Sequence, residues 1–245
     1  MTLWAVSLLI VGPIMLLHAF LTGNIEPLYR SGMKIAIICV RLVGVKIEVR
    51  GLENIQSSRS YIFMSNHVSN LDPPVFVPNI PGRCSVLLKK EVLRIPIFGR
   101  VLKMAEMVPV DRSNREAAIE SVHAAAEVLR RGLNMVIFPE GTRSPDGRLL
   151  PFKKGPFHLA MEANVPVIPV TLLGTFECWP KGTWAMRKGK TTVIFHPPIE
   201  PSEFSDRDDL MVAVRTAIAS ALPEDRREPG PIVEADTSRA EARRE

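Results

Sequence analysis

A histidine and an aspartate lie five positions apart in the segment 66–72, NHVSNLD, which follows the apolar run Tyr61–Met64 after one serine. A neutral imidazole can accept a proton near pH 7, and a carboxylate on its other nitrogen fixes the tautomer and stabilises the resulting imidazolium. On a regular helix, residues five apart point about 140° away from each other. His67 and Asp72 can therefore meet only if the buried strand expected at 61–64 is followed by a turn.

The dipeptide Asp72-Pro73 is typical of a helix start, with aspartate as the N-cap and proline in the first turn. A strand, His67, a turn and Asp72 at a helix start form a plausible geometry for a general base with its orienting acid. In the alternative interpretation Asp72 only caps the helix and His67 is an ordinary loop histidine. These residues alone leave both interpretations open.

A second segment, FPEGTRS at 138–144, also has residue types that could bind a ligand or take part in a reaction. It comes directly after another apolar run. The forked donors of Arg143 can hold a phosphate, and Gly141 allows the backbone to come close to a ligand. The alternative is a plain turn with a local ion pair between Glu140 and Arg143. Composition does not separate the two.

Seven strand-like runs and two helix-like runs alternate along the chain and would position these segments. Alternation at these lengths predicts an α/β fold with a mostly parallel central sheet flanked by helices. Pro109 lacks a backbone donor, which places its strand near an edge. The expected strands are 46–50, 61–64, 84–88, 106–110, 134–138, 167–173 and 191–195, and the expected helices are 113–131, which starts with a capping box, and 153–163.

The amino-terminal region has the composition of a membrane element. Met1–Leu21 contains no charged residue, and about 20 such residues can span a bilayer. No Lys or Arg precedes this run and no clear cleavage site follows it, which favours a retained segment over a signal peptide. Together with Ile35–Val45, it predicts either one spanning helix kinked at Gly12-Pro13 or two helices in one leaflet. Packing on a soluble domain is the alternative.

These patterns divide the chain into three parts. Residues 1–45 are predicted to form membrane-associated helices, and residues 46–222 the α/β domain. From Pro223 the sequence is rich in Glu, Asp, Arg and Pro and nearly free of apolar residues, so 223–245 is predicted to be a disordered tail.

The charge balance and the spacing of motifs exclude several functions. The net charge of +5 and pI of about 9.3 come without a long basic block, a zinc-finger spacing or an aromatic-basic signature, so we expect no nucleic-acid partner. A membrane surface or an anionic substrate explains the charge better. No two glycines lie four apart, which excludes the G-x-S-x-G nucleophile elbow. His123/Glu127 and His158/Glu162 have helical spacing but no third ligand, so we expect ion-paired helix faces and no metal site.

Taken together, segments 66–72 and 138–144 resemble the signature of the glycerolipid acyltransferases, most closely the 1-acyl-glycerol-3-phosphate acyltransferases. Further blocks are similar in order and spacing, and the resemblance covers roughly residues 45 to 200. These blocks are LKKE at 88–91, VPVDR at 108–112 and VPVIPV at 165–170. The second differs from the family in carrying Glu106-Met-Val-Pro where a glycine and a larger side chain are common.

The resemblance implies transfer of an acyl group from a thioester to a free hydroxyl of a lysophospholipid, which forms phosphatidic acid. His67 would be the general base and Asp72 its orienting acid. The substrate-binding residues implied are Lys89, Arg112, Glu140, Gly141, Thr142 and Arg143.

The resemblance also implies the partners. The acyl donor would be acyl-CoA or acyl carrier protein, used as a co-substrate with no resident cofactor. The acceptor and the product would reside among membrane lipids, so we expect a membrane-associated enzyme with its active domain at the cytosolic face. Two alternatives stay open: a different acceptor, such as glycerol-3-phosphate, another lysophospholipid or a lyso-aminolipid, and a non-catalytic lipid-binding protein on the same fold.

Overall fold

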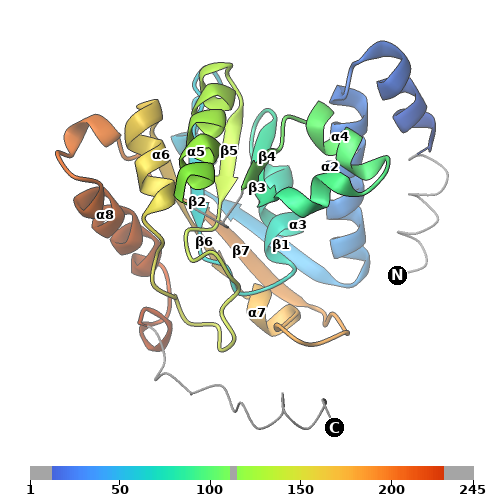
Figure 1. Ribbon diagram of the computed structural model, residues 1–245. Helices are drawn as coiled ribbons and strands as arrows, with labels where there is room; N and C mark the ends of the chain where they lie inside the picture. Colours follow the sequence, from blue (N-terminus) through green and yellow to red (C-terminus); the bar gives the residue numbers. More distant parts are fainter. Residues whose placement is uncertain (1–12, 111–114, 229–245) are drawn as a thin grey trace, which may run out of the picture.

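The computed structural model describes residues 13–110 and 115–228, except for the side chains of Lys89, Val110 and 115–119 (Figure 1). A central sheet has the strand order β1-β7-β6-β2-β5-β3-β4. All neighbouring strands are parallel except β6 and β7. The strands are β1 (Val45–Arg50), β2 (Ile62–Ser65), β3 (Cys84–Lys89), β4 (Val108–Val110), β5 (Asn134–Ile137), β6 (Val167–Leu173) and β7 (Gly189–Phe195).

The predicted fold class is confirmed for the sheet and its covering helices. All seven expected strands are present with bounds within two residues, and β4 with Pro109 lies at an edge. The described residues also form five short 3-10 helices, four between the main elements and one after α8. The helices are 13–22, α2 (Glu26–Leu42), α3 (Asp72–Phe76), α4 (Phe98–Met104), α5 (Arg115–Arg130), α6 (Gly155–Ala163), α7 (Thr175–Cys178) and α8 (Arg207–Ser220).

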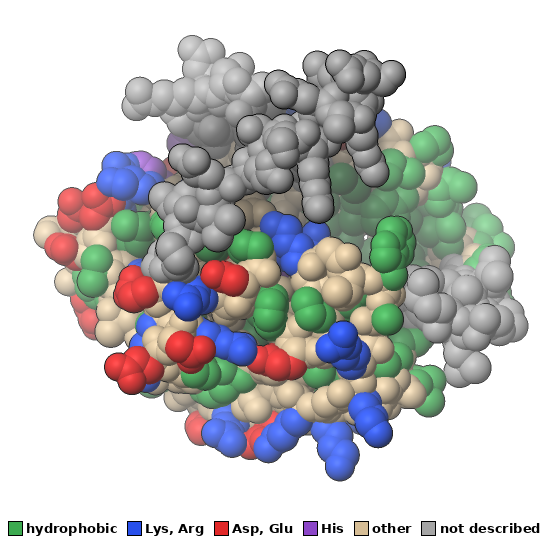
Figure 2. All heavy atoms as spheres, turned by 90° about the horizontal axis from the view of Figure 1, so that it is seen from below, with side chains coloured by type: hydrophobic (Ala, Val, Ile, Leu, Met, Phe, Trp, Pro, Cys, Tyr) green, Lys and Arg blue, Asp and Glu red, His purple; other side chains and the backbone are tan. Residues whose placement is uncertain are grey.

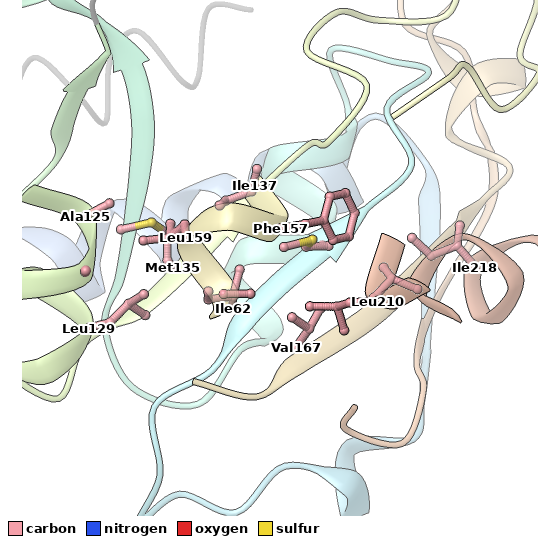
Figure 3. Packing of buried hydrophobic residues seen from close by; sticks show 14 of the residues in the cluster. Ile62, Ala125, Leu129, Met135, Ile137, Phe157, Leu159, Val167, Leu210 and Ile218 are labelled. Carbon is pink, nitrogen blue, oxygen red and sulfur yellow. The ribbon is translucent and has the colours of Figure 1, made fainter. Parts of the chain in front are cut away.

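The side chains of the strands alternate between two hydrophobic cores. Ile62 of β2 faces the side covered by α5, α6 and α8, where it lies near Met135 and Phe157 (Figure 3). Phe63 faces the opposite side and packs edge-on against Phe76 of α3 at 6.3 Å between ring centroids. Each fully buried side chain of this size contributes about 1.5–3 kcal/mol. Burial on both faces fixes the register of β2, and with it the point at which the chain turns into His67.

The amino-terminal region forms two helices in its described part. Helix 13–22 and α2 are separated by a break at 23–25, and they contact each other and α4 through a small cluster that includes Ala19, Ile25 and Ala105. Residues 1–12, with Gly12, lie outside the described residues. None of the helices in the described part of the chain is long and apolar enough to cross a bilayer. Membrane association of 1–45 stays a prediction.

The described start of the predicted tail is ordered. Residues 224–226 form a 3-10 helix, and the carbonyl of Arg226 accepts a hydrogen bond from the Leu149 amide at 2.9 Å. The guanidinium of Arg226 also pairs with Glu177 of α7. Residues 223–228 therefore pack on the domain, and residues 229–245 lie outside the described residues.

The sheet topology brings the two chemically interesting segments together. β2 lies between β5 and β6 and is parallel to both. Their carboxyl ends therefore meet at one edge, which is where parallel sheets place ligands. Segment 66–72 follows β2 and segment 138–144 follows β5 at this edge, near α7 in Figure 1.

Candidate active site

His67 and Asp72 meet across a tight turn, as the first interpretation of their spacing predicts. His67 Nδ1 and Asp72 Oδ2 are 2.8 Å apart. The aspartate is fully buried, whereas the histidine side chain keeps 18% of its surface exposed. Nδ1 is engaged by the carboxylate, which leaves Nε2 as the nitrogen available to take a proton. The interpretation of His67 as an isolated loop histidine is wrong.

Asp72 does not cap its helix. It is the first residue of α3, where Leu71 occupies the N-cap position with no side-chain bond. Its Oδ2 instead accepts from the backbone amides of Val68 at 2.7 Å and Ser69 at 2.8 Å, while Oδ1 is buried without a hydrogen-bond partner. The predicted N-cap is therefore wrong, because the carboxylate turns back over the preceding loop. Three donors on one oxygen fix the position of that oxygen beside the imidazole.

The backbone around His67 is bonded to strand β6 and to the loop after β5. The side chain of Asn66 exchanges two hydrogen bonds with the backbone of Leu172 in β6, at 3.0 and 2.8 Å. The carbonyl of His67 accepts from the amide of Ser144 at 2.8 Å. The ring itself stacks on Phe138, with centroids 4.0 Å apart and planes 20° apart. Sequence reasoning assigned no role to Asn66 or Phe138, although each is the first residue of one of the two singled-out segments.

Glu140 holds the amide of His67. Its Oε1 accepts from that amide at 2.7 Å, and its Oε2 accepts from the amide of Leu150 at 3.0 Å. The residue is only 2% exposed. Burial raises the pKa of Glu140 to about 8, although the two amide donors act to lower it. The carboxylate thus joins the loop after β2 to both ends of the loop after β5.

The predicted alternative of a Glu140–Arg143 ion pair is wrong. Both oxygens of Glu140 are engaged by backbone amides, and Arg143 Nη1 instead donates to Asn70 Oδ1 at 2.5 Å. Arg143 is thereby held beside the turn that carries His67. Its guanidinium is partly exposed at the open edge of the site, where an anionic group can approach.

The rest of segment 138–144 is turn. Gly141 has φ of +71°, a conformation that L side chains rarely adopt, and its amide closes the turn by donating to Phe138 at 3.0 Å. Thr142 is exposed. The structure therefore places Glu140, Gly141 and Arg143 around His67, with Thr142 on the surface beside them.

The other two predicted binding residues cannot be placed by their side chains. Lys89 is the last residue of β3, where it pairs with Val110, and its side chain lies outside the description. Arg112 lies outside the described residues. Both stay predictions.

A cavity of about 450 Å³ lies beside the imidazole. His67 lies on its wall, and residues of β3, β5, α5 and α6 line much of the rest. Most of the lining is apolar, so the cavity suits a hydrocarbon chain better than a polar ligand. The apolar wall includes Val86, Leu87, Val122, Ile137, Phe138 and Leu159.

The site thus combines a histidine paired with a buried aspartate, a cation at the rim and a mostly apolar cavity. The model of a family described as Acyltransferase matches residues 46–173, which is more than half of the chain. The chain belongs to the acyltransferase family. The matched region runs from β1 to β6 and contains both site segments.

Individual curated relatives and one solved structure are similar to this chain over much of its length. A 1-acyl-sn-glycerol-3-phosphate acyltransferase from Limnanthes alba is 38% identical over 189 residues, covering 76% of this chain and 66% of the relative. The human 1-acyl-sn-glycerol-3-phosphate acyltransferase alpha is 34% identical, covering 69% of this chain and 60% of the relative. The crystal structure of the 1-acyl-sn-glycerophosphate (LPA) acyltransferase PlsC from Thermotoga maritima is similar with a TM-score of 0.76 at 28% identity, covering 93% of each chain. The chain spans just under two thirds of the length of the first curated relatives.

His123 and His158 contact side chains of neighbouring helices. His123 of α5 bonds to Glu162 of α6 at 2.5 Å, and His158 contacts Arg207. The predicted i,i+4 pairs are thus replaced by contacts between helices. Within 13–110 and 115–228, no cluster of three or more His, Cys, Asp and Glu side chains could hold a metal ion.

Replacing Glu140 with glutamine should alter how stability depends on pH. The raised pKa means that the folded state holds a proton on Glu140 more tightly than the unfolded chain, whose value is near 4.5. Its contribution is therefore fully present below pH 4.5 and is lost as the pH rises to about 8. Over this window the wild type should lose up to about 1.4 kcal/mol per pH unit relative to Glu140→Gln. Denaturant unfolding of both proteins between pH 4.5 and about 8 measures this difference in the free energy of unfolding. Parallel stability curves for the two proteins would contradict the raised pKa of Glu140.

Proposed function

We propose that this chain transfers a fatty acyl group from an acyl thioester to the free sn-2 hydroxyl of 1-acyl-glycerol-3-phosphate, forming phosphatidic acid. The observation that carries the proposal is the 2.8 Å contact between His67 Nδ1 and Asp72 Oδ2 on the wall of an apolar cavity. The names of the relatives support the same acceptor.

In the proposed reaction, His67 Nε2 removes the proton of the acceptor hydroxyl as its oxygen attacks the thioester carbonyl. Asp72 orients the ring and balances the positive charge that the imidazole gains. Collapse of the tetrahedral intermediate breaks the C–S bond, and the proton returns from His67 to the sulfur, which leaves as a free thiol. No covalent acyl-enzyme is required. General-base assistance contributes about 10²–10⁴-fold, and holding both substrates in place supplies much of the remainder.

The phosphate of the acceptor is proposed to bind at the rim of the site. Arg143 offers forked donors there, and Lys89, the last residue of β3, and Arg112 are proposed as further cations for the phosphate. Glu140 acts in this scheme by holding the His67 amide, not by contacting glycerol. The apolar cavity would take an acyl chain.

The protein is proposed to work at the cytosolic face of a membrane. The lysophospholipid and the product are lipids, whereas acyl-CoA and acyl carrier protein are soluble, so the reaction needs access to both phases. The exposed apolar side chains of helix 13–22, such as Leu17 and Leu21, support this location.

An acceptor panel tests the proposed function. Membranes containing the full chain are supplied with acyl-CoA or acyl carrier protein and, separately, with lysophosphatidic acid, glycerol-3-phosphate and lysophosphatidylcholine. We expect lysophosphatidic acid to be consumed with release of free thiol. Consumption of another acceptor in its place would change the proposed substrate while keeping the chemistry, and no consumption of any acceptor with either donor would contradict the function.

Replacing Arg143 with alanine should raise the KM for lysophosphatidic acid by about 10–100-fold, because a charge-assisted bond to phosphate is worth about 1.5–3 kcal/mol. Thermal unfolding should change little, since the lost contact to Asn70 is partly exposed. Arg148→Ala is the matched control: Arg148 lies in the same loop and pairs with Asp146. If Arg143→Ala lost stability as strongly as acceptor affinity, Arg143 would be assigned to holding the loop.

A further inference from the structure

An ordered loop between α7 and β7, residues 179–186, presents a fully exposed tryptophan. The indole of Trp179 donates to the carbonyl of Thr183 at 2.9 Å, and the hydroxyl of Thr183 donates to the carbonyl of Pro180 at 2.9 Å. These bonds hold a compact turn with Trp184 at its tip, 98% exposed. An exposed large aromatic on a rigid turn has no role in packing its own domain.

Trp184 borders an apolar groove of about 570 Å³ between the loop and the carboxyl-terminal half of α2. Next to the groove, Leu42 is 62% exposed and Ile38, one helical turn earlier, is 53% exposed. The lining is apolar throughout and consists of Ala36, Cys39, Val40, Leu42, Val43, Pro74, Trp179, Trp184, Ala185 and Met186. The loop and α2 thus form one exposed apolar surface from distant parts of the chain.

Cations accompany this surface. Residues 178–199 contain four Lys or Arg and no Asp or Glu. Lys181, Arg187 and Lys188 are exposed, and Lys188 lies against Gly44 at the end of α2, where an added Cβ would be 3.0 Å from its own. Figure 2, seen from the α7 side of Figure 1, shows Lys and Arg side chains among apolar ones on this face. An exposed tryptophan with flanking cations is typical of a protein surface at an anionic membrane interface.

The loop is bonded directly to both segments of the candidate active site. The carbonyl of Trp179 accepts from Ser69 Oγ at 2.7 Å, and Ser69 also donates its amide to Asp72. On the other side, Lys181 Nζ donates to the carbonyl of Arg143 at 2.9 Å. Whatever surface the loop rests on therefore lies beside the opening of the site.

We propose that loop 179–186 and the carboxyl-terminal half of α2 form a docking surface for a bilayer containing anionic phospholipid, with Trp184 inserted at the interface. The value of this surface to the enzyme rests on the proposed function, because it places the rim at Arg143 where a lipid acceptor arrives. Binding itself does not depend on catalysis.

Vesicle binding by the full chain tests the proposal without any substrate. Vesicles of phosphatidylcholine with about one-third phosphatidylglycerol are compared with phosphatidylcholine alone. We expect Trp184→Ala to bind the anionic vesicles about tenfold more weakly, a loss of about 1.4 kcal/mol. Arg187→Gln with Lys188→Gln should remove much of the preference for anionic vesicles. Val212→Ala, which truncates a 60% exposed apolar residue on α8, is the matched control and should bind as the wild type does.

A second measurement covers the case in which other segments dominate the affinity. Brominated phosphatidylcholine in the anionic vesicles should quench the fluorescence of the wild type, and Trp184→Phe should lose that component of the quenching. Unchanged affinity in Trp184→Ala together with unchanged quenching in Trp184→Phe would overturn the proposal, as would absence of vesicle binding. A protein that binds vesicles through Trp184 but consumes no acceptor would contradict the proposed function alone.

Discussion

His67→Ala should lower kcat for acyl transfer by about 10²–10⁴-fold, the usual contribution of a general base. The imidazole lies on the wall of the cavity, and its Nδ1 is already committed to Asp72. Alanine cannot remove the hydroxyl proton, whereas the cavity and Arg143, the proposed phosphate contact, are left in place. The KM for the acceptor should therefore change much less than kcat. Release of free thiol from acyl-CoA under saturating lysophosphatidic acid measures the effect.

Two further variants distinguish a loss of catalysis from a loss of folding in this experiment. His123→Ala removes a histidine whose side chain is 64% exposed and pairs with Glu162, and it should keep wild-type activity. His67→Gln keeps a polar side chain against Phe138 and should be as inactive as His67→Ala. Thermal unfolding of each variant should show a folded protein. Thioester turnover that survived in both His67 variants would remove His67 from the mechanism.

The strands of the sheet could be predicted from the sequence because local patterns determine them. Runs such as Val167–Leu173 are buried on both faces, and buried strands of a parallel sheet are written as continuous apolar stretches. Pro109 marks an edge because it has no amide to donate. Helix α5 was expected from the capping-box sequence at 113–116, whose first two residues lie outside the described residues, and from Gly132 after its end. None of these inferences needed a contact between distant residues.

The incorrect predictions at the site concern contacts that local sequence patterns do not determine. Glu140 and Arg143 are three positions apart, so a local ion pair was a natural alternative, yet Glu140 bonds to an amide 73 positions earlier in the chain. Similarly, Asp72 before Pro73 has the local signature of an N-cap, but its carboxylate turns toward His67. In each case a tertiary contact outcompetes a local one. The lining of the cavity by β3, β5, α5 and α6 is likewise a product of the tertiary fold.

The sequence predicted that His67 and Asp72 could meet only across a turn, and the structure has that contact. Its consequence for catalysis can be tested at Asp72. Asp72→Asn should lower kcat by about 10²–10⁴-fold while the protein stays folded. The amide oxygen of asparagine can take the place of Oδ2 and keep the bonds from Val68 and Ser69. What is lost is the negative charge that balances the imidazolium.

The unpartnered Oδ1 makes this a sharp test. In Asp72→Asn the amide nitrogen would occupy the position of Oδ1, which has no hydrogen-bond partner, so the variant buries one unsatisfied donor at a cost of about 1–3 kcal/mol. Asp72→Ala is the matched comparison, because it removes the charge and also leaves the amides of Val68 and Ser69 without an acceptor. We expect both variants to lose kcat to a similar extent, and Asp72→Ala to lose more stability in denaturant unfolding.

Single-turnover kinetics at saturating acceptor separates the chemical step from binding. An Asp72→Asn protein with wild-type kcat would show that the buried charge does not assist proton removal, and the carboxylate would then be assigned to holding the turn alone.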